Sequence, residues 1–413
     1  RISQENFLKN SKVFNELKLR ASYGQTGNQE GIRLYDYIQL LKFRDDGWGT
    51  KLIYPFGNGS QSQAMGLDVL AGVDRTWEIL ENVNVGVDAA FLDSRLGFSF
   101  DYFVKMNNNM LIPVTYPSML GAEAPYSNSG KLRTNGFELT LNWTDKIGNV
   151  EYSAQFQLTD AVNKLVEYGG ADTYKLGLNE TREGYPMNSY FAYVYDGVIK
   201  DQADLDAYKK LEGVPSNIGI GDAKFKDLNG DGKISTYGDK DGDDGDAEYV
   251  GSTTPRYSFG LNLGAKWNNF DISVFFQGVA KRTLFREGDF AMPWSDWWRY
   301  PPQFYYGQTW NEDRPDAYYP RLTHGEIRHW NYQASTLQKI NAAYIRLKNI
   351  QIGYTLPKGA LQKLGIERTR FYVSGQDLFE IHNVKGGWDP ESDKAGFNYP
   401  FQRYYSFGID LTF

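Results

Sequence analysis

The last ten residues of the chain alternate between apolar side chains and small or polar ones. From Ser406 onward the even positions are Ser, Gly, Asp and Thr, whereas every odd position from Tyr405 to Phe413 is aromatic or aliphatic. Because successive side chains of a β-strand point to opposite faces, this segment predicts a strand with one apolar and one polar face. A membrane-spanning barrel with a wet lumen uses such strands, and so does the edge of a soluble β-sandwich.

The same alternation recurs in pairs of segments that are joined by short turns or links. The paired segments are 83–91 with 98–102, 137–143 with 150–158, 257–263 with 270–276, and 350–356 with 371–373. In the second pair, the face opposite the apolar one is too polar for a sandwich core, since it carries Glu138, Thr140, Asn142, Gln155 and Gln157. The pattern therefore favours an all-β fold, a transmembrane antiparallel β-barrel with short turns at one rim.

Long segments join the other ends of these hairpins, at about 24–76, 106–133, 168–255 and 280–343. Connections of this length are usually functional, so we expect them to be extracellular loops of one domain that covers residues 1–413. The chain contains about ten strands, and an open sheet edge would leave backbone groups unpaired in lipid. We therefore expect it to be the C-terminal part of a larger barrel whose other strands precede it.

Composition excludes several classes of protein. Apolar residues make up 41% of the chain, its mean hydropathy is −0.55, and no apolar run is long enough for a transmembrane helix. The formal charge of −7 provides no basic surface for nucleic acid. With no cysteine and three histidines, the chain has no disulfide framework, no thiolate metal site and few members for a catalytic triad. The sequence also lacks a nucleotide-binding fingerprint, and we expect it not to be an enzyme.

Residues 227–235 have the spacing of a calcium-binding loop. Asp227, Asn229 and Asp231 offer side-chain oxygens at positions one, three and five of the loop. A glycine follows at position six for the turn, and the main-chain carbonyl of Lys233 stands at position seven. Because all of these donors are oxygens on a flexible loop, they favour Ca²⁺ over Mg²⁺.

The end of this loop departs from the pattern. Position twelve, where a bidentate acid is expected, is Gly238, and Asp239, Asp241 and further aspartates up to Asp246 follow it. We expect Asp239 and Asp241 to complete a structural metal site that braces the loop at 168–255. The alternative is a solvated acidic turn that uses Asp, Asn and Gly for their backbone tolerance.

A second cluster of chemistry lies within residues 290–333, which are rich in aromatic residues and proline. The candidates for contact with a substrate or a protein partner are Trp294, Trp297, Trp298, Tyr300, Tyr305, Tyr306 and Trp310. Flat aromatic faces can pack on sugar rings, and Trp, Tyr and Arg are also enriched at protein interfaces. The third interpretation is a loop that packs its own small core.

Five segments of the chain resemble blocks of the SusC/RagA family of TonB-dependent outer-membrane transporters. They are LKLRASYGQTGNQ at 17–29, FKDLNGDGKI at 225–234, GSTTPRYSFG at 251–260, YIRLKNIQIGYTLP at 344–357 and RFYVSGQDLF at 370–379. The resemblance runs in order from about residue 17 to the end of the chain, so it is more specific than any single motif.

The resemblance implies a 22-stranded barrel in the outer membrane, in contact with lipid, whose plug and first half lie outside this chain. It also implies energised import of oligomeric nutrients, with a SusD-like lipoprotein as lid and a TonB contact in the absent N-terminal part. Oligosaccharides are the favoured substrate and oligopeptides the alternative. Two other functions stay open, namely an outer-membrane adhesin or receptor barrel without energised transport, and a soluble calcium lectin built as a sandwich.

Overall fold

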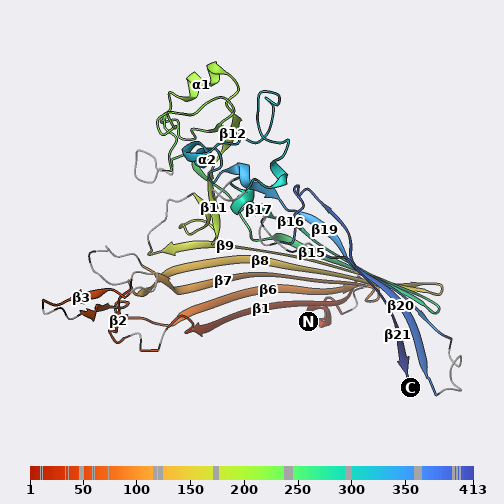
Figure 1. The fold of residues 1–413 in the computed structure, drawn as a ribbon. Helices are drawn as coiled ribbons and strands as arrows, with labels where there is room; N and C mark the ends of the chain where they lie inside the picture. Colours follow the sequence, from red (N-terminus) through yellow and green to blue (C-terminus); the bar gives the residue numbers. More distant parts are fainter. Residues whose placement is uncertain are drawn as a thin grey trace.

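The computed structural model is dominated by one large antiparallel sheet (Figure 1). The described residues are 1–413 except 10, 12, 33, 36, 46–50, 58, 60, 73, 115–118, 120–123, 171–175, 237–244, 294–299, 358–364, 393–395, 397, 398 and 400. The side chains of residues 178 and 179 are also outside the description.

Ten strands form the sheet, and each pairs antiparallel with the strands beside it. Their order across the sheet is the same as their order along the chain. They are β1 (Phe14–Asn28), β6 (Glu78–Phe91), β7 (Leu96–Pro113), β8 (Tyr126–Ile147), β9 (Val150–Tyr168), β15 (Arg256–Trp267), β16 (Phe270–Lys281), β19 (Tyr344–Thr355), β20 (Arg368–His382) and β21 (Tyr404–Thr412). The predicted all-β antiparallel fold is confirmed, because every hairpin expected from alternation is a pair of neighbouring strands.

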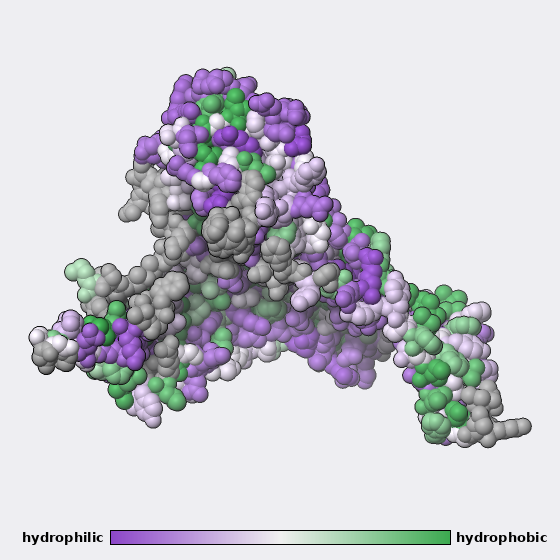
Figure 2. All heavy atoms as spheres, in the orientation of Figure 1, coloured by the Kyte–Doolittle hydropathy of each residue, from purple (hydrophilic) through white to green (hydrophobic). Residues whose placement is uncertain are grey.

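The register of the sheet places the apolar side chains on one face. Leu141 pairs with Phe156, Phe156 with Leu261, and Leu261 with Phe276, so one apolar row crosses four strands. Since side chains alternate along a strand, the adjacent residues form rows on the opposite, polar face. The apolar face remains open on the last strand, where Phe407 is 82% exposed. Figure 2 shows hydrophobic side chains gathered over the end of the sheet formed by β20 and β21.

The two ends of the sheet have connections of different length. At one end the connections are residues 92–95, 148–149, 268–269 and 356–367, and at the other end they are 29–77, 114–125, 169–255, 282–343 and 383–403. Strands β7 and β8 extend into the segment expected to be the second loop. The connection at 383–403 was not anticipated from the sequence.

Apart from η1 (Ile2–Gln4), which precedes β1, the remaining elements of the described residues lie in the long connections. These are β2 (Leu41–Phe43), β3 (Ile53–Pro55), β4 (Gln61–Gln63), β5 (Met65–Leu67), β10 (Gly177–Glu180), β11 (Ser189–Tyr193), β12 (Tyr195–Val198), α1 (Gln202–Tyr208), β13 (Ala223–Phe225), β14 (Ala247–Ser252), β17 (Thr283–Phe285), η3 (Gly288–Phe290), η4 (Gln303–Tyr305), α2 (Gly325–Asn331), η5 (Thr336–Gln338) and β18 (Lys339–Asn341). Among the described residues, neither α-helix has the length and apolar character to cross a membrane.

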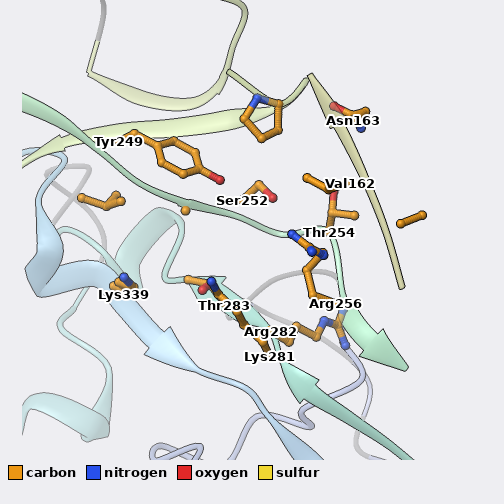
Figure 3. A pocket seen from close by; sticks show the side chains of 14 residues that line it. Val162, Asn163, Tyr249, Ser252, Thr254, Arg256, Lys281, Arg282, Thr283 and Lys339 are labelled. Carbon is orange, nitrogen blue, oxygen red and sulfur yellow. The ribbon is translucent and has the colours of Figure 1, made fainter. Parts of the chain in front are cut away.

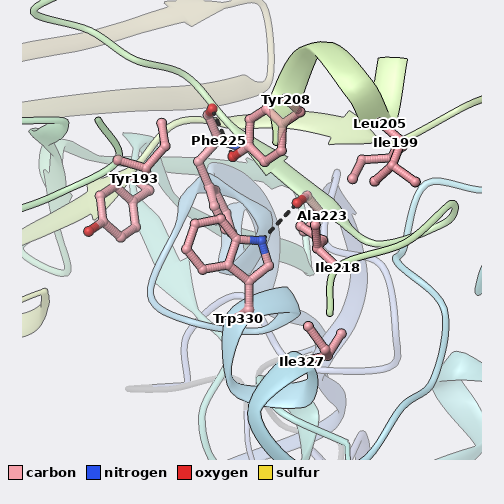
Figure 4. Packing of buried hydrophobic residues seen from close by; sticks show 10 residues of the cluster. Tyr193, Ile199, Leu205, Tyr208, Ile218, Ala223, Phe225, Ile327 and Trp330 are labelled. Atoms are coloured by element: carbon pink, nitrogen blue, oxygen red, sulfur yellow. Dashed lines mark hydrogen bonds between the residues drawn. The ribbon is translucent and has the colours of Figure 1, made fainter. Parts of the chain in front are cut away.

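The described residues of the connections 169–255 and 282–343 fold together into one body, which we call the loop lobe (Figure 1). Its main core consists of Tyr193, Ile199, Leu205, Tyr208, Ile218, Ala223, Phe225, Ile234, Ile327 and Trp330 (Figure 4). The first eight residues come from one connection and the last two from the other. The lobe therefore has an interior of its own, beside a sheet whose outward and inward side chains stay largely accessible.

Candidate functional site

A buried ion pair joins the two halves of the loop lobe. The Asp222 side chain is fully buried, and its two carboxylate oxygens accept hydrogen bonds from Arg321 Nε at 2.7 Å and Nη2 at 2.8 Å. The same carboxylate accepts bonds from the Gly219 main chain at 2.7 Å and from Asn331 Nδ2 at 2.9 Å. Four donors thus compensate the desolvation of one carboxylate, which a buried charge requires.

Helix α2 is held against strand β13 by side-chain bonds to the main chain. The indole N–H of Trp330 donates to the Ala223 carbonyl at 3.0 Å, and the Ala223 N–H donates to Asn331 Oδ1 at 2.8 Å. Figure 4 shows the Trp330 ring in the middle of the core, and its centroid lies 5.4 Å from that of Phe225. Residues more than a hundred positions apart in sequence are therefore packed against one another.

A second cluster of buried aromatic residues supports the segment that was predicted to bind a substrate or partner. Tyr305, Tyr319, Tyr332 and Leu337 form this cluster, and Arg286 donates hydrogen bonds to the Tyr319 hydroxyl and the Leu337 carbonyl. Tyr305 is only 1% exposed and its hydroxyl donates to the Phe290 carbonyl at 2.5 Å. The expectation of a contact role for Tyr305 is thus corrected to a packing role.

Other tyrosines of this segment point outward. Tyr300 is 88% exposed, Tyr306 is 89% exposed and Tyr318 is 59% exposed. Pro301, Pro302 and Arg314 line a hollow of about 630 Å³ beside Tyr306. We call Tyr300, Tyr306 and Tyr318 the tyrosine surface, and it is available for a flat apolar ligand or a protein partner.

Of the four tryptophans predicted as contact residues, only Trp310 is among the described residues. Trp310 is half-buried, and its ring packs on Gly221 so closely that a Cβ there would lie 2.2 Å from Trp310 Cε3. Gly221 has φ of +85°, so both its backbone and its space favour glycine. Trp310 therefore helps to join the two connections. Trp294, Trp297 and Trp298 lie outside the described residues.

The acidic loop at 227–235 has the turns that its sequence predicts. Asp227 accepts hydrogen bonds from the main-chain N–H groups of Gly230 at 2.7 Å and Gly232 at 2.9 Å, and Asp231 accepts one from that of Lys233 at 2.9 Å. Gly230 and Gly232 have φ of +74° and +81°, in the left-handed region that favours glycine.

A neighbouring aspartate closes this acidic loop. Asp246 is 1% exposed and accepts bonds from Leu228 N–H at 2.6 Å and Ser235 N–H at 2.9 Å, at the two ends of the loop. Burial raises the pKa of the Asp246 carboxyl, and the negative charges of Asp227 and Asp231 raise that pKa further. A bound cation would reduce the electrostatic repulsion among these three carboxylates.

The donors for a metal are only partly within the described residues. In that part of the chain, no three acidic, histidine or cysteine side chains are grouped closely enough to hold an ion. Asp227, Asn229 and Asp231 supply oxygens of the type that calcium takes, with the main chain of Lys233 next to them. Asp239 and Asp241 lie outside the described residues.

The polar face of the sheet has a hollow of about 480 Å³ whose lining carries no charged side chain. One row of residues pairs in succession across five strands, namely Asn142, Gln155, Asn262, Phe275 and Asn349. The next row contains Thr144, Ser153, Gly264 and Ser273. The wall therefore presents amides and hydroxyls, which both donate and accept hydrogen bonds, beside one aromatic ring.

Charged groups on the same face are paired with one another. Arg20 bonds to Asp88 at 2.8 Å and to Asp101 at 2.7 Å. Arg370 bonds to Asp271 at 2.6 Å and to Asp410 at 3.3 Å. Arg20, Asp88 and Asp101 lie on β1, β6 and β7, to one side of the uncharged hollow. Asp271 lies on β16, which also lines the hollow, and Arg370 and Asp410 lie on β20 and β21 beyond it.

Sequence reasoning missed the residues that hold the connection at 383–403. Arg346 on β19 is 1% exposed and bonds to Asp389 at 2.6 Å, and Lys348 bonds to Glu391 at 2.9 Å. The Phe401 ring lies 4.3 Å from the Arg346 guanidinium carbon. Two cations at alternate positions of a strand, with acids in the following loop, were the available signal.

Comparisons with known proteins agree with the fold. No model of a protein family matches the chain. TonB-dependent receptor P3 of Formosa agariphila is 27% identical over the whole chain, which corresponds to 41% of that receptor. TonB-dependent receptor SusC of Bacteroides thetaiotaomicron is 24% identical over the whole chain and 39% of its own length. The chain thus spans about two-fifths of these relatives.

A solved structure of the RagAB peptide transporter has the same fold. It matches the whole chain with a TM-score of 0.74 at 23% identity, and the match covers 42% of the transporter chain. The five sequence blocks, the ten-stranded sheet and the full-length similarity to named receptors lead to one conclusion. Over its whole length the chain is similar to TonB-dependent receptors, and its sheet has the fold of the barrel of the RagAB transporter.

Proposed function

We propose that this chain forms part of the wall and the outer lobe of an importer for oligomeric nutrients, driven through TonB. The observation that carries the proposal is an apolar outer face opposite an inner face whose central hollow is lined by uncharged, hydrogen-bonding side chains. The outer face suits lipid, and the inner wall suits a polar solute that must pass without being trapped by a fixed charge. Similarity over the whole chain to a receptor named SusC supports the same class of function.

Oligosaccharides are the substrate that we favour. Hydroxyl-rich solutes need groups that donate and accept hydrogen bonds, and the amides of Asn142, Gln155 and Asn262 do both. Phe275 adds an apolar surface in the same row, which can pack against the C–H face of a sugar ring. Oligopeptides are the alternative, because a peptide backbone makes similar bonds and RagAB is a peptide transporter.

The loop lobe is proposed to contact a SusD-like lipoprotein that acts as a lid. Tyr306 and Tyr318 of the tyrosine surface each lie next to a buried tyrosine of the cluster, Tyr305 and Tyr319, so packed side chains support this part of the surface. Exposed tyrosines on a fixed support are typical of interface contacts. Trp294, Trp297 and Trp298 belong to the same sequence segment and are proposed to extend this surface.

A structural Ca²⁺ in the acidic loop is proposed to brace the lobe. Asp227, Asn229 and Asp231 would bind it, with the Lys233 carbonyl and with Asp239 or Asp241. Burial is the main reason why the pKa of Asp246 is raised, and the nearby charges of Asp227 and Asp231, which a cation would offset, raise that pKa further. The proposed chemistry is transport, so none of these residues is assigned a catalytic role.

The test uses the full-length transporter in its native host, with the substitutions Tyr300→Ala and Tyr306→Ala combined. A matched control combines Tyr37→Ala and Tyr54→Ala, which remove two exposed tyrosines from another connection. We expect the first variant to lose co-purifying lipoprotein and to slow growth on oligosaccharide, while the control behaves like the wild type. Heat-modifiable mobility on gels would verify that both barrels are folded.

Two further arms separate the alternatives. Growth on oligopeptides instead of oligosaccharides would assign the peptide function, and uptake that persists without TonB would support a passive receptor. Normal lipoprotein capture and normal uptake in the Tyr300 and Tyr306 variant would show that the tyrosine surface is not the lid contact.

A further inference from the structure

A third pocket lies where the sheet meets the loop lobe. It has a volume of about 440 Å³ and is lined by the end of β9, by the segment from β14 to β15, and by the segment from β16 to β17 with the start of β18. Figure 3 shows Arg256, Lys281 and Arg282 on one side of it, Lys339 on the other, and Thr283 between them. The transport proposal does not use this pocket.

The pocket has an excess of positive charge. Its lining contains four cationic side chains, Arg256, Lys281, Arg282 and Lys339, and no acidic side chain. Asp160 neutralises Arg256 through two bonds of 2.5 Å. Within the described residues, neither Lys281 nor Lys339 has an ion-pair partner, and both side chains are exposed.

Arg282 is held in place without being neutralised. Its guanidinium donates to the main-chain carbonyls of Pro390 at 2.5 Å and Ser392 at 2.9 Å, which are uncharged acceptors. Its Nε is buried and has no acceptor among the described residues. Three cationic side chains in this pocket therefore keep their charge uncompensated, and one of them is fixed by the protein.

Hydroxyl groups complete the lining. Ser252, Thr254 and Thr283 all border the pocket. Gly251 lies beside Thr283, and its φ of +133° is a backbone conformation that favours glycine. Positive charges combined with neutral O–H donors suit an oxyanion that accepts several hydrogen bonds at once.

We propose that this pocket binds a phosphate group. A phosphate carries one to two negative charges near neutral pH and three acceptor oxygens, so it can balance Lys281, Lys339 and Arg282 together. Lysines bind phosphate well because they act as mobile point charges. The phosphate can belong to a membrane lipid, since the pocket lies where strands leave the sheet, or to a soluble phosphorylated molecule.

The test measures inorganic phosphate binding by titration calorimetry on the full-length protein in uncharged detergent. Lys281→Gln and Lys339→Gln are made singly and together, and Lys209→Gln with Lys210→Gln is the control that removes the same charge from an exposed part of the lobe. We expect each single pocket substitution to weaken binding about tenfold, as the loss of a charge-assisted hydrogen bond does. The double pocket variant should bind more weakly still, and the control should bind like the wild type.

A second measurement identifies the source of the phosphate. Proteins in nanodiscs of phosphatidylcholine with phosphatidylglycerol are released and examined by native mass spectrometry. Retention of phosphatidylglycerol by the wild type and the control, but not by the double pocket variant, assigns a lipid headgroup. Phosphate binding without lipid retention assigns a soluble ligand. The proposal is overturned if the wild type does not bind phosphate, or if the double pocket variant and the control bind it equally.

Discussion

The ion pair between Asp222 and Arg321 should control whether the loop lobe stays closed as one body. The two partners differ in their access to water, since the Arg321 side chain is 37% exposed and the Asp222 side chain is 0% exposed. The loss of one partner should therefore have unequal effects. We expect Arg321→Ala to be more damaging than Asp222→Asn.

The magnitudes follow from what each substitution leaves behind. Arg321→Ala strands a buried carboxylate with two remaining donors, and breaking a buried pair in this way costs roughly 3 to 5 kcal/mol. Asp222→Asn keeps the shape and leaves a guanidinium that water can reach, so it should cost about 2 kcal/mol, as the loss of charge-assisted bonds does. The double variant should cost less than the sum of the two, with a coupling of about 1 to 3 kcal/mol.

Amide hydrogen exchange on the full-length protein measures this local free energy. Peptides that cover residues 217–226 and 317–333 should lose protection in the variants, because Ala223 N–H and the α2 helix depend on the contact. A peptide from β8 should be unchanged, since the sheet does not depend on the lobe. Equal effects of Arg321→Ala and Asp222→Asn, or strictly additive effects in the double variant, would refute the reasoning.

The remaining predictions concern the membrane face and the acidic loop. Phe156→Arg should destabilise the folded barrel by about 2 to 4 kcal/mol, whereas Gln155→Arg, on the inner face, should fold normally. Equal loss of folded barrel in the two variants on heat-modifiability gels would contradict the assigned faces. Asp227→Ala with Asp231→Ala should leave the barrel intact but increase protease cleavage within 169–255 and remove protection by calcium, and undiminished calcium protection in that variant would exclude the site. Because burial raises the pKa of Asp246, the metal-free lobe should become more stable as the pH falls from neutral through that pKa, and less stable as the pH rises through it. Calcium should reduce this pH dependence and Asp246→Asn should remove it, as measured by protease resistance in EDTA.

Local patterns in the sequence were enough to predict the sheet. Alternate residues of a strand face two different surroundings, so the polarity of every second residue indicates which face it belongs to. The apolar residues found in this way, Leu141, Phe156, Leu261 and Phe276, lie in one row across four strands. The turns of the acidic loop were predictable for a similar reason, because Asp227 bonds to main-chain groups only three and five residues away. Both features depend on neighbours along the chain.

Tertiary structure alone decided which loop residues are buried. Tyr305 and Tyr306 are adjacent and chemically identical, yet one is 1% exposed and the other 89% exposed. Asp222 and Arg321 lie 99 positions apart, and the alternate cations Arg346 and Lys348 do not by themselves show that Asp389 and Glu391 pack on them. An irregular loop buries a residue according to which distant segment packs on it, so its interior could not be predicted without the fold. The cationic pocket has the same origin, because pairing of β15 with β16 sets Arg256 opposite Lys281 and the lobe then adds Lys339.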